Sequence, residues 1–196
     1  MNPLALHRGL SALIASLALG WGRSEAAAQG GATLGPAQVI SLAAARINTL
    51  SVSVTSGAVQ SIAAVQDNAV NAFPAPVAIT TQWDVQPGQT NSVSLVAYFT
   101  TPAQAMTGGT VQIPSSRILG RVATGLPTTF TAFTQAAVAG AGTAGGSLTL
   151  FAVNISGQNK QLSRTDNLDL QLNLVGFPDL PVGVYTGTLN IRAVAQ

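Results

Sequence analysis

The clearest pattern in the chain is an alternation of leucine and polar residues near the C-terminus. Within residues 167–175, leucines at 168, 170, 172 and 174 alternate with Asp, Gln and Asn. Because successive side chains of a strand point to opposite faces, this run predicts a strand with a leucine row on the core. A Gly/Pro segment, residues 176–183, leads to a second alternating run, residues 185–193. The two runs predict an antiparallel hairpin, since the connection is too short for a parallel crossover.

Shorter runs of the same kind recur through the rest of the chain. They predict strands at residues 50–54, 58–65, 77–83, 93–99, 111–113, 118–122, 128–134 and 147–155. Pro87-Gly88 is typical of a type II turn, so the runs on either side of it predict a second antiparallel pair. Residues 101–106 predict one helical turn, with Thr101 as its cap and Pro102 at its first position.

This pattern predicts an all-β fold. Roughly seven to nine short strands, spaced by Gly, Pro and Asn/Asp turns, indicate an antiparallel immunoglobulin-like β-sandwich with no long helix. A closed barrel is the alternative architecture. Trp83 continues the apolar face of its run and is expected in the core, although it could also stack on a sugar. Tyr98 alternates outward and is the candidate for an exposed ligand-binding aromatic.

The N-terminus has the pattern of a secretory signal peptide. His7 and Arg8 precede an apolar run at residues 10–19, and residues 26–28 are three alanines. The apolar run is too short to cross a bilayer as a helix. We therefore expect a signal peptide at residues 1–28, a flexible or strand-like extension at 29–46 and a single sandwich domain at 47–196. The exported protein is expected to be secreted, periplasmic or at the cell surface, with no transmembrane segment once the signal is removed.

Composition excludes several kinds of function. Beyond residue 28, the basic residues are scattered, which argues against a nucleic-acid partner; they are Arg46, Arg117, Arg121, Lys160, Arg164 and Arg192. There is no cysteine, and the one histidine lies in the signal segment. Disulfides, Ser-His-Asp or Cys-His catalysis and an ordinary zinc site therefore have no residues to use.

The remaining candidates for chemistry are weak. Asp166, expected in a turn, and Asp169, expected to point outward, are interpreted as solvated surface residues, although with Asn167 they could assist a calcium ion. Residues 140–145 match G-x-G-x-x-G, but a β-like run follows instead of the helix that a dinucleotide needs, so they are interpreted as a hairpin tip. No enzyme, cofactor or metal site is predicted.

The last strand also carries a resemblance. Residues 181–194, with Pro181, Gly183 and Tyr185 before a β-run, resemble the closing segment of secreted bacterial β-sandwich proteins of the spore-coat-U, fimbrial-subunit and WxL types. The same residues look like the tyrosine corner of immunoglobulin-like folds, which implies that the Tyr185 hydroxyl bonds to nearby backbone. The cysteines usual in fimbrial and spore-coat-U-like proteins, and the W-x-L motif, are absent.

These observations predict a non-enzymatic structural or adhesive surface protein, such as a fimbria-like subunit. The alternative is an extracellular module that binds a carbohydrate or another ligand. The resemblance to pilins implies self-association through an edge strand, in which residues 39–50 would pair with another copy. The same segment could instead complete the sheet of its own chain.

Overall fold

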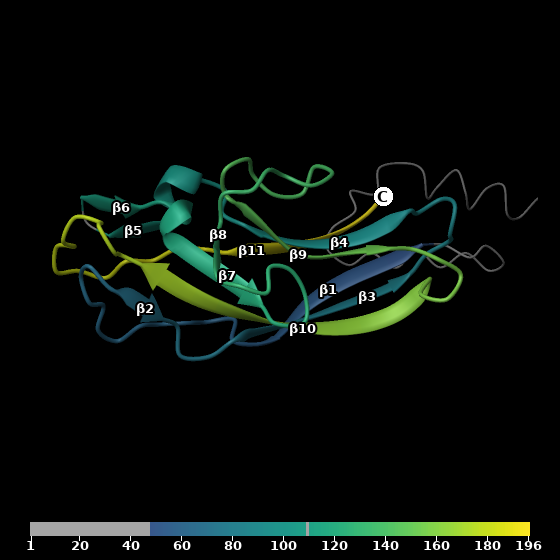
Figure 1. The fold of residues 1–196 in the computed structure, drawn as a ribbon, viewed down its shortest axis with the longest axis horizontal. Coiled ribbons are helices and arrows are strands. Elements are labelled where there is room, and N and C mark those ends of the chain that lie inside the picture. Colours follow the sequence, from purple (N-terminus) through teal and green to yellow (C-terminus); the bar gives the residue numbers. More distant parts are fainter. Residues whose placement is uncertain (1–47, 109) are drawn as a thin grey trace, which may run out of the picture. The chain divides into compact units, whose positions relative to one another are not determined.

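The computed structural model describes residues 48–108 and 110–196 (Figure 1). The predicted signal peptide and the extension at residues 29–46 lie outside these ranges. The described part contains eleven strands and two short 3-10 turns, with the following bounds: β1 Thr49–Ser56, β2 Val70–Ala72, β3 Val77–Asp84, β4 Ser92–Tyr98, η1 Pro102–Gln104, β5 Met106–Gly108, β6 Val111–Ile113, η2 Ser115–Arg117, β7 Ile118–Val122, β8 Thr131–Ala132, β9 Ser147–Asn154, β10 Gln161–Asn173 and β11 Asn190–Ala195. None of the described helices has the length and apolar character needed to span a membrane.

The strands form open antiparallel sheets, as the all-β prediction requires. The larger sheet has the order β1-β3-β10-β7-β8, with β2 also pairing with β10. The second sheet has the order β11-β4-β9, and β5 and β6 form a separate hairpin. Figure 1 shows the two main sheets as two layers, and the buried apolar side chains of both form one core cluster.

The core confirms the alternation seen in the sequence. The leucines at 168, 170, 172 and 174 are all at most 9% exposed. Trp83 on β3 is buried as well, and its indole N–H donates to the Asn159 carbonyl at 2.8 Å. Its ring lies 6.1 Å from that of Phe151 on the opposite sheet. Trp83 is therefore a core residue that bridges the two layers.

Both predicted hairpins are wrong. β10 lies between β3 and β7, whereas β11 pairs with β4 in the other sheet. β3 and β4 likewise belong to different sheets, although the Gln86–Gln89 turn between them has Gly88 at φ 90° as expected. Alternation identifies a strand and its buried face but not its neighbour, and here both connections, residues 85–91 and 174–189, cross between the layers.

Several element bounds also differ from expectation. Residues 58–65 form no strand, and the short β2 follows them instead. The expected strand at 128–134 is reduced to Thr131–Ala132. The helical turn after Thr101 is the 3-10 turn η1, and the Thr101 side chain makes no capping bond. β10 begins at Gln161, six residues before the alternating run from which it was predicted.

Asp166 is the largest correction among the candidate residues. It lies within β10 and is fully buried, whereas a solvated turn residue was expected. Its carboxylate accepts two hydrogen bonds from the Arg164 guanidinium, at 2.7 and 2.6 Å, and one from the Thr124 hydroxyl at 3.3 Å. Asp169 does face solvent and pairs with Arg121 at 2.7 Å. The two carboxylates are thus held in separate ion pairs.

Thr81 on β3 provides a test of this core. Its side chain is buried between Ile79 and Trp83 on the inner face, and its hydroxyl has no hydrogen-bond partner. Replacing Thr81 with Val should raise the free energy of unfolding by about 1 kcal/mol, because it removes an unsatisfied buried polar group while keeping the shape. Urea denaturation measures this. The control is Thr80→Val, which should give no gain because the Thr80 hydroxyl bonds to the Thr165 hydroxyl at 2.9 Å.

Candidate functional site

One side of the sandwich is sealed by its own chain. The loop after β7 runs along the outer edge of β9, where the Leu126 N–H donates to the Leu150 carbonyl at 2.7 Å. Further along, the Gln135 N–H donates to the Ser147 carbonyl at 2.9 Å, and the Gln135 side chain accepts from the Thr149 N–H at 2.8 Å. Both the core and the strand edge are therefore covered on this side.

The opposite side has two strand edges without a described neighbour. β11 is the edge of the smaller sheet, and within residues 48–196 only β4 pairs with it. Ser92 and Gln196 exchange backbone hydrogen bonds of 3.0 and 2.9 Å. This pair shows which residues of β11 bond to β4 and which do not. In an antiparallel ladder, alternate residues turn their backbone groups to the partner. The N–H and C=O groups of Ile191, Ala193 and Ala195 therefore point away from β4, toward the open side.

β1 forms the facing edge in the larger sheet. The Val85 N–H bonds to the Lys160 carbonyl, so the odd-numbered residues of β3 turn their backbone groups to β10 and the even-numbered ones to β1. Given the register of β1 on β3, Leu50 and Val52 then turn their backbone groups to the open side. The side chains of both residues also pack against the core. Each edge thus combines outward backbone groups with inward apolar side chains.

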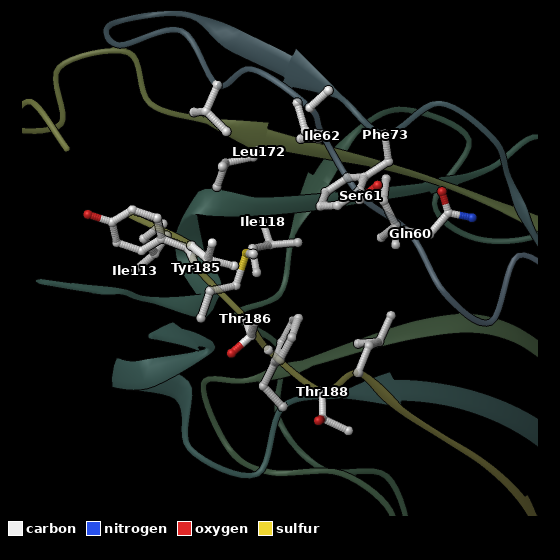
Figure 2. Close-up of a pocket in the computed structure, with 18 of the residues that line it drawn as sticks. Gln60, Ser61, Ile62, Phe73, Ile113, Ile118, Leu172, Tyr185, Thr186 and Thr188 are labelled. Carbon is white, nitrogen blue, oxygen red and sulfur yellow. The ribbon is translucent and has the colours of Figure 1, made fainter. Parts of the chain in front are cut away.

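A groove of about 820 Å³ lies beside the end of β1 and the start of β11, and its lining includes Val54, Leu189 and Ile191. Figure 2 shows its two walls, with Ile62, Phe73 and Leu172 on one side and Tyr185, Thr186 and Thr188 on the other. Core residues from both layers form the floor; they include Phe99, Ile113, Ile118 and Leu170. The groove is therefore an opening in the hydrophobic core, unlike a polar surface cleft.

The wall before β11 is held by a close backbone contact. Thr107 on β5 and Thr186 exchange backbone hydrogen bonds of 2.8 and 3.0 Å. A Cβ on Gly187 would lie 2.1 Å from the Ala105 carbonyl oxygen, so only glycine permits this approach. The Tyr185 hydroxyl donates to the Pro181 carbonyl at 2.8 Å. These contacts position the apolar wall of the groove.

The mouth of the groove is apolar and exposed. Val182 and Val184 line it and are 108% and 81% exposed. Exposed apolar side chains at the rim of a partly apolar groove are a feature that interaction sites share. The mouth therefore favours a protein or another apolar partner.

Asp67 is the one charged residue among the described residues that line the groove. Its carboxylate accepts the Leu180 N–H at 3.0 Å, and the neighbouring Asn68 side chain accepts the Gly176 N–H at 2.9 Å. The turn at 67–68 is thus fastened to the loop that leads toward β11. These hydrogen bonds to backbone N–H groups hold the Asp67 carboxylate at the mouth of the groove.

The residues singled out from the sequence take different places. Tyr185 and Gly183 line the groove, whereas Tyr98 is half-buried on β4 and is not among the lining residues. Gly183 has neither a positive φ nor a neighbour that would exclude a Cβ, so its backbone does not require glycine. Residues 140–145 form tight turns that lead into β9 at Ser147.

No sequence pattern indicates the other groove residues. Ile62, Asp67 and Phe73 lie in or next to irregular segments, where no periodicity marks a buried face. The Gly-rich Thr186–Thr188 segment was interpreted as the start of a regular strand, whereas β11 begins only at Asn190. In the described ranges, no three His, Cys, Asp or Glu side chains gather as a metal site would need.

Known proteins offer no comparison for this arrangement. No model of a protein family, no curated protein and no solved structure matches the chain.

Proposed function

We propose that this protein is a non-enzymatic structural subunit, exported to the cell surface, that self-associates in a fimbria-like manner by accepting a β-strand in its groove. The observations that support this most are the groove in the core beside the start of β11 and the outer edge of β11, which has no hydrogen-bonded partner among the described residues. An added strand could pair with the outward backbone groups of β11 and cover apolar side chains of the groove. Enzymatic chemistry has no comparable support, since the polar groups of the groove are those of Gln60, Ser61, Tyr185, two threonines and the backbone, with a single carboxylate.

The strand order supports an immunoglobulin-like sandwich in which no strand among the described residues occupies the position of the last one, G. In that fold one sheet has the order A-B-E-D and the other contains C, F and G. β1, β3, β10 and β7 have the order of A, B, E and D, while β4 and β11 are placed as C and F. Strand G would lie on the outer edge of β11, where the groove opens. Tyr185 before β11, with its bond to upstream backbone, is placed as in a tyrosine corner.

The free energy available from such pairing is large. Fully burying one Leu, Ile or Val side chain contributes about 1.5–3 kcal/mol, and several side chains at the groove are only partly buried. Exposed strand edges also tend to pair with other chains unless they are blunted or covered. Leu189 and Ile191, which line the groove and are only partly buried, are available for this contact.

Removing the N-terminal extension tests the proposal. Residues 29–196 should form chains or oligomers that grow with concentration, whereas the protein lacking residues 29–46 should stay monomeric. Light scattering and electron microscopy measure the two sizes. If residues 29–196 remain monomeric at every concentration, the structural proposal is wrong. Saturable retention of that monomer on a glycan array would then favour the alternative, a carbohydrate-binding module.

A further inference from the structure

We propose that β1 forms a second, symmetric contact between copies of this chain, in which the β1 strands of two copies pair antiparallel about a twofold axis at Val52. The contact joins the larger sheets of the two copies into one continuous sheet. It does not rest on the proposed function, because strand addition uses the groove and the edge of β11, whereas this contact uses the edge of β1. The partner that fits this edge is therefore the same strand of a second copy.

β1 is an edge strand without the features that usually protect an edge. It has eight residues, none of them charged or proline, and its register on β3 shifts only after Val54. Natural edge strands are kept from pairing with other chains by lysine, proline, bulges, short length or a covering loop. By contrast, β8 at the other side of the sheet has two residues, the outer edge of β9 is bonded to loop backbone, and β11 carries the exposed Arg192. Among these edges, β1 is the one best able to pair with another chain.

The sequence of β1 is symmetric about Val52. Reading outward from Val52, the residues on its two sides form three like pairs: Ser51 and Ser53, Leu50 and Val54, and Thr49 and Thr55. When two identical strands pair antiparallel about Val52, each residue faces the other member of its pair in the second copy. Apolar residues then meet apolar residues on the inner face, and hydroxyls meet hydroxyls on the outer face. The strand is therefore complementary to itself.

The backbone groups of β1 have the alternation that this register needs. Thr49, Ser51 and Ser53 lie opposite the even-numbered residues of β3, which turn their backbone groups to β1. The even-numbered residues of β1, from position 50 to position 54, therefore turn their N–H and C=O groups to the open edge. About Val52, position 50 of one copy faces position 54 of the other, so outward groups meet outward groups. This alignment allows about six backbone hydrogen bonds between the copies.

Neighbouring registers are less favourable. Moving the axis by one residue toward the N-terminus keeps the backbone alternation but places Asn48 opposite Val54 on the inner face. Moving it by one residue the other way places Ser56 opposite Leu50. In a symmetric contact a charge near the axis also faces its own copy, and β1 has no charged residue to cause such repulsion. The axis at Val52 alone keeps three apolar pairs.

The size of the contact sets its strength. Interfaces of standard size take about 20–30 residues from each partner. β1 offers eight, so two isolated copies should pair weakly and remain mostly monomeric in dilute solution. Where strand addition links copies into chains, many β1 contacts would act together between two chains and strengthen one another. The contact is therefore tested at high protein concentration with a reaction that traps it.

Because the chain has no cysteine, two single variants test the register. Ser51 of one copy faces Ser53 of the other in a non-hydrogen-bonded pair, with Cα atoms about 4.5 Å apart, which suits a disulfide. Identical positions lie on a diagonal, about 8 Å apart, which is too far. Under mild oxidation of residues 29–196, a mixture of Ser51→Cys and Ser53→Cys should form the heterodimer about tenfold faster than either variant alone forms its homodimer. Mass spectrometry identifies the linked peptides.

The two variants serve as controls for each other, since both side chains lie on the outer face of the sheet and neither lines the groove. Homodimers that form as fast as the heterodimer would refute the register, because they would show random collision. No cross-link in any sample would refute the contact, and is the result expected if residues 29–46 cover the edge of β1. Chain growth by strand addition can be measured in the same proteins, so failure of this contact is distinguishable from failure of the proposed function.

Discussion

Replacing Arg164 with methionine should lower the free energy of unfolding by about 3–5 kcal/mol, because it leaves the buried carboxylate of Asp166 without its counter-charge. The Asp166 side chain is 0% exposed and depends on Arg164 for two of its three hydrogen bonds. Arg164 also donates to the Thr124 carbonyl at 2.6 Å and stacks 4.7 Å above the Phe151 ring. Chemical denaturation with tryptophan fluorescence measures the loss, since Trp83 lies beside Phe151.

The matched control is Arg121→Met. Arg121 makes a similar bond to Asp169 and stacks on Phe130 at 4.6 Å, but the side chains of the pair are 41% and 35% exposed. Water can solvate Asp169 after the substitution, so the expected loss is about 1 kcal/mol or less. Equal losses for the two variants would contradict the role given to burial. In the double variant Arg164→Met with Asp166→Leu, most of the stability should return, as no buried charge remains.

Replacing Phe133 with alanine should be of similar severity, lowering the free energy of unfolding by about 3–5 kcal/mol. Phe133 is fully buried, and its ring lies edge-on to that of Phe99 at 5.3 Å and 73°. It also packs where Gly120 leaves no room for a side chain, since a Cβ there would lie 3.1 Å from the Phe133 ring. The neighbours cannot collapse easily into the space, so a cavity should remain. Thermal unfolding followed by circular dichroism measures the effect.

Phe130, three residues earlier, is the control for this position. It is half-buried and contacts the Arg121 guanidinium, so Phe130→Ala should cost about 1–2 kcal/mol. A loss for Phe133→Ala no larger than that for Phe130→Ala would show that the sealed side of the sandwich is looser than its burial indicates. Neither residue lines the groove, so both variants should still self-associate when folded.

The sealed and open sides of the sandwich have different physical roles. On the sealed side, Leu148, Leu150 and Phe133 are buried by segments of the same chain, and the outer edge of β9 is bonded to loop backbone. On the open side, Leu189 and Ile191 remain half-buried, and within the described residues the edge of β11 has no hydrogen-bonded partner beyond β4. The sealed side thus buries its apolar side chains within the chain, and the self-association proposed above would use the open side.

Much of the strand content could be predicted because alternation is a local signal. The leucines of β10 and the apolar face of β3 were identified from residue identity alone, since a strand shows its two faces at a period of two. The partners of these strands could not be predicted. β10 bonds to β3 and β7, and β11 to β4, through contacts between segments that lie far apart in the sequence. Side-chain alternation does not encode such pairing.

The residues of the candidate site could be predicted only in part from the sequence, for the same reason. Tyr185 was singled out as a turn residue, but its membership of a groove wall depends on β5 lying beside Thr186. Asp166 was expected in solvent because an Asp among Arg, Thr and Asn looks like a polar turn. Its burial depends on Thr124 and Phe151, which come from other parts of the chain.

By itself the sequence determined that the described part is β-structured, free of cysteine and dependent on an apolar core, because these properties follow from composition and from a period of two along the chain. Only the tertiary structure decided which strand edges stay open. Whether the core is closed depends on how many strands each sheet has and which lies outermost. That is set by packing between the two layers, which no local pattern specifies.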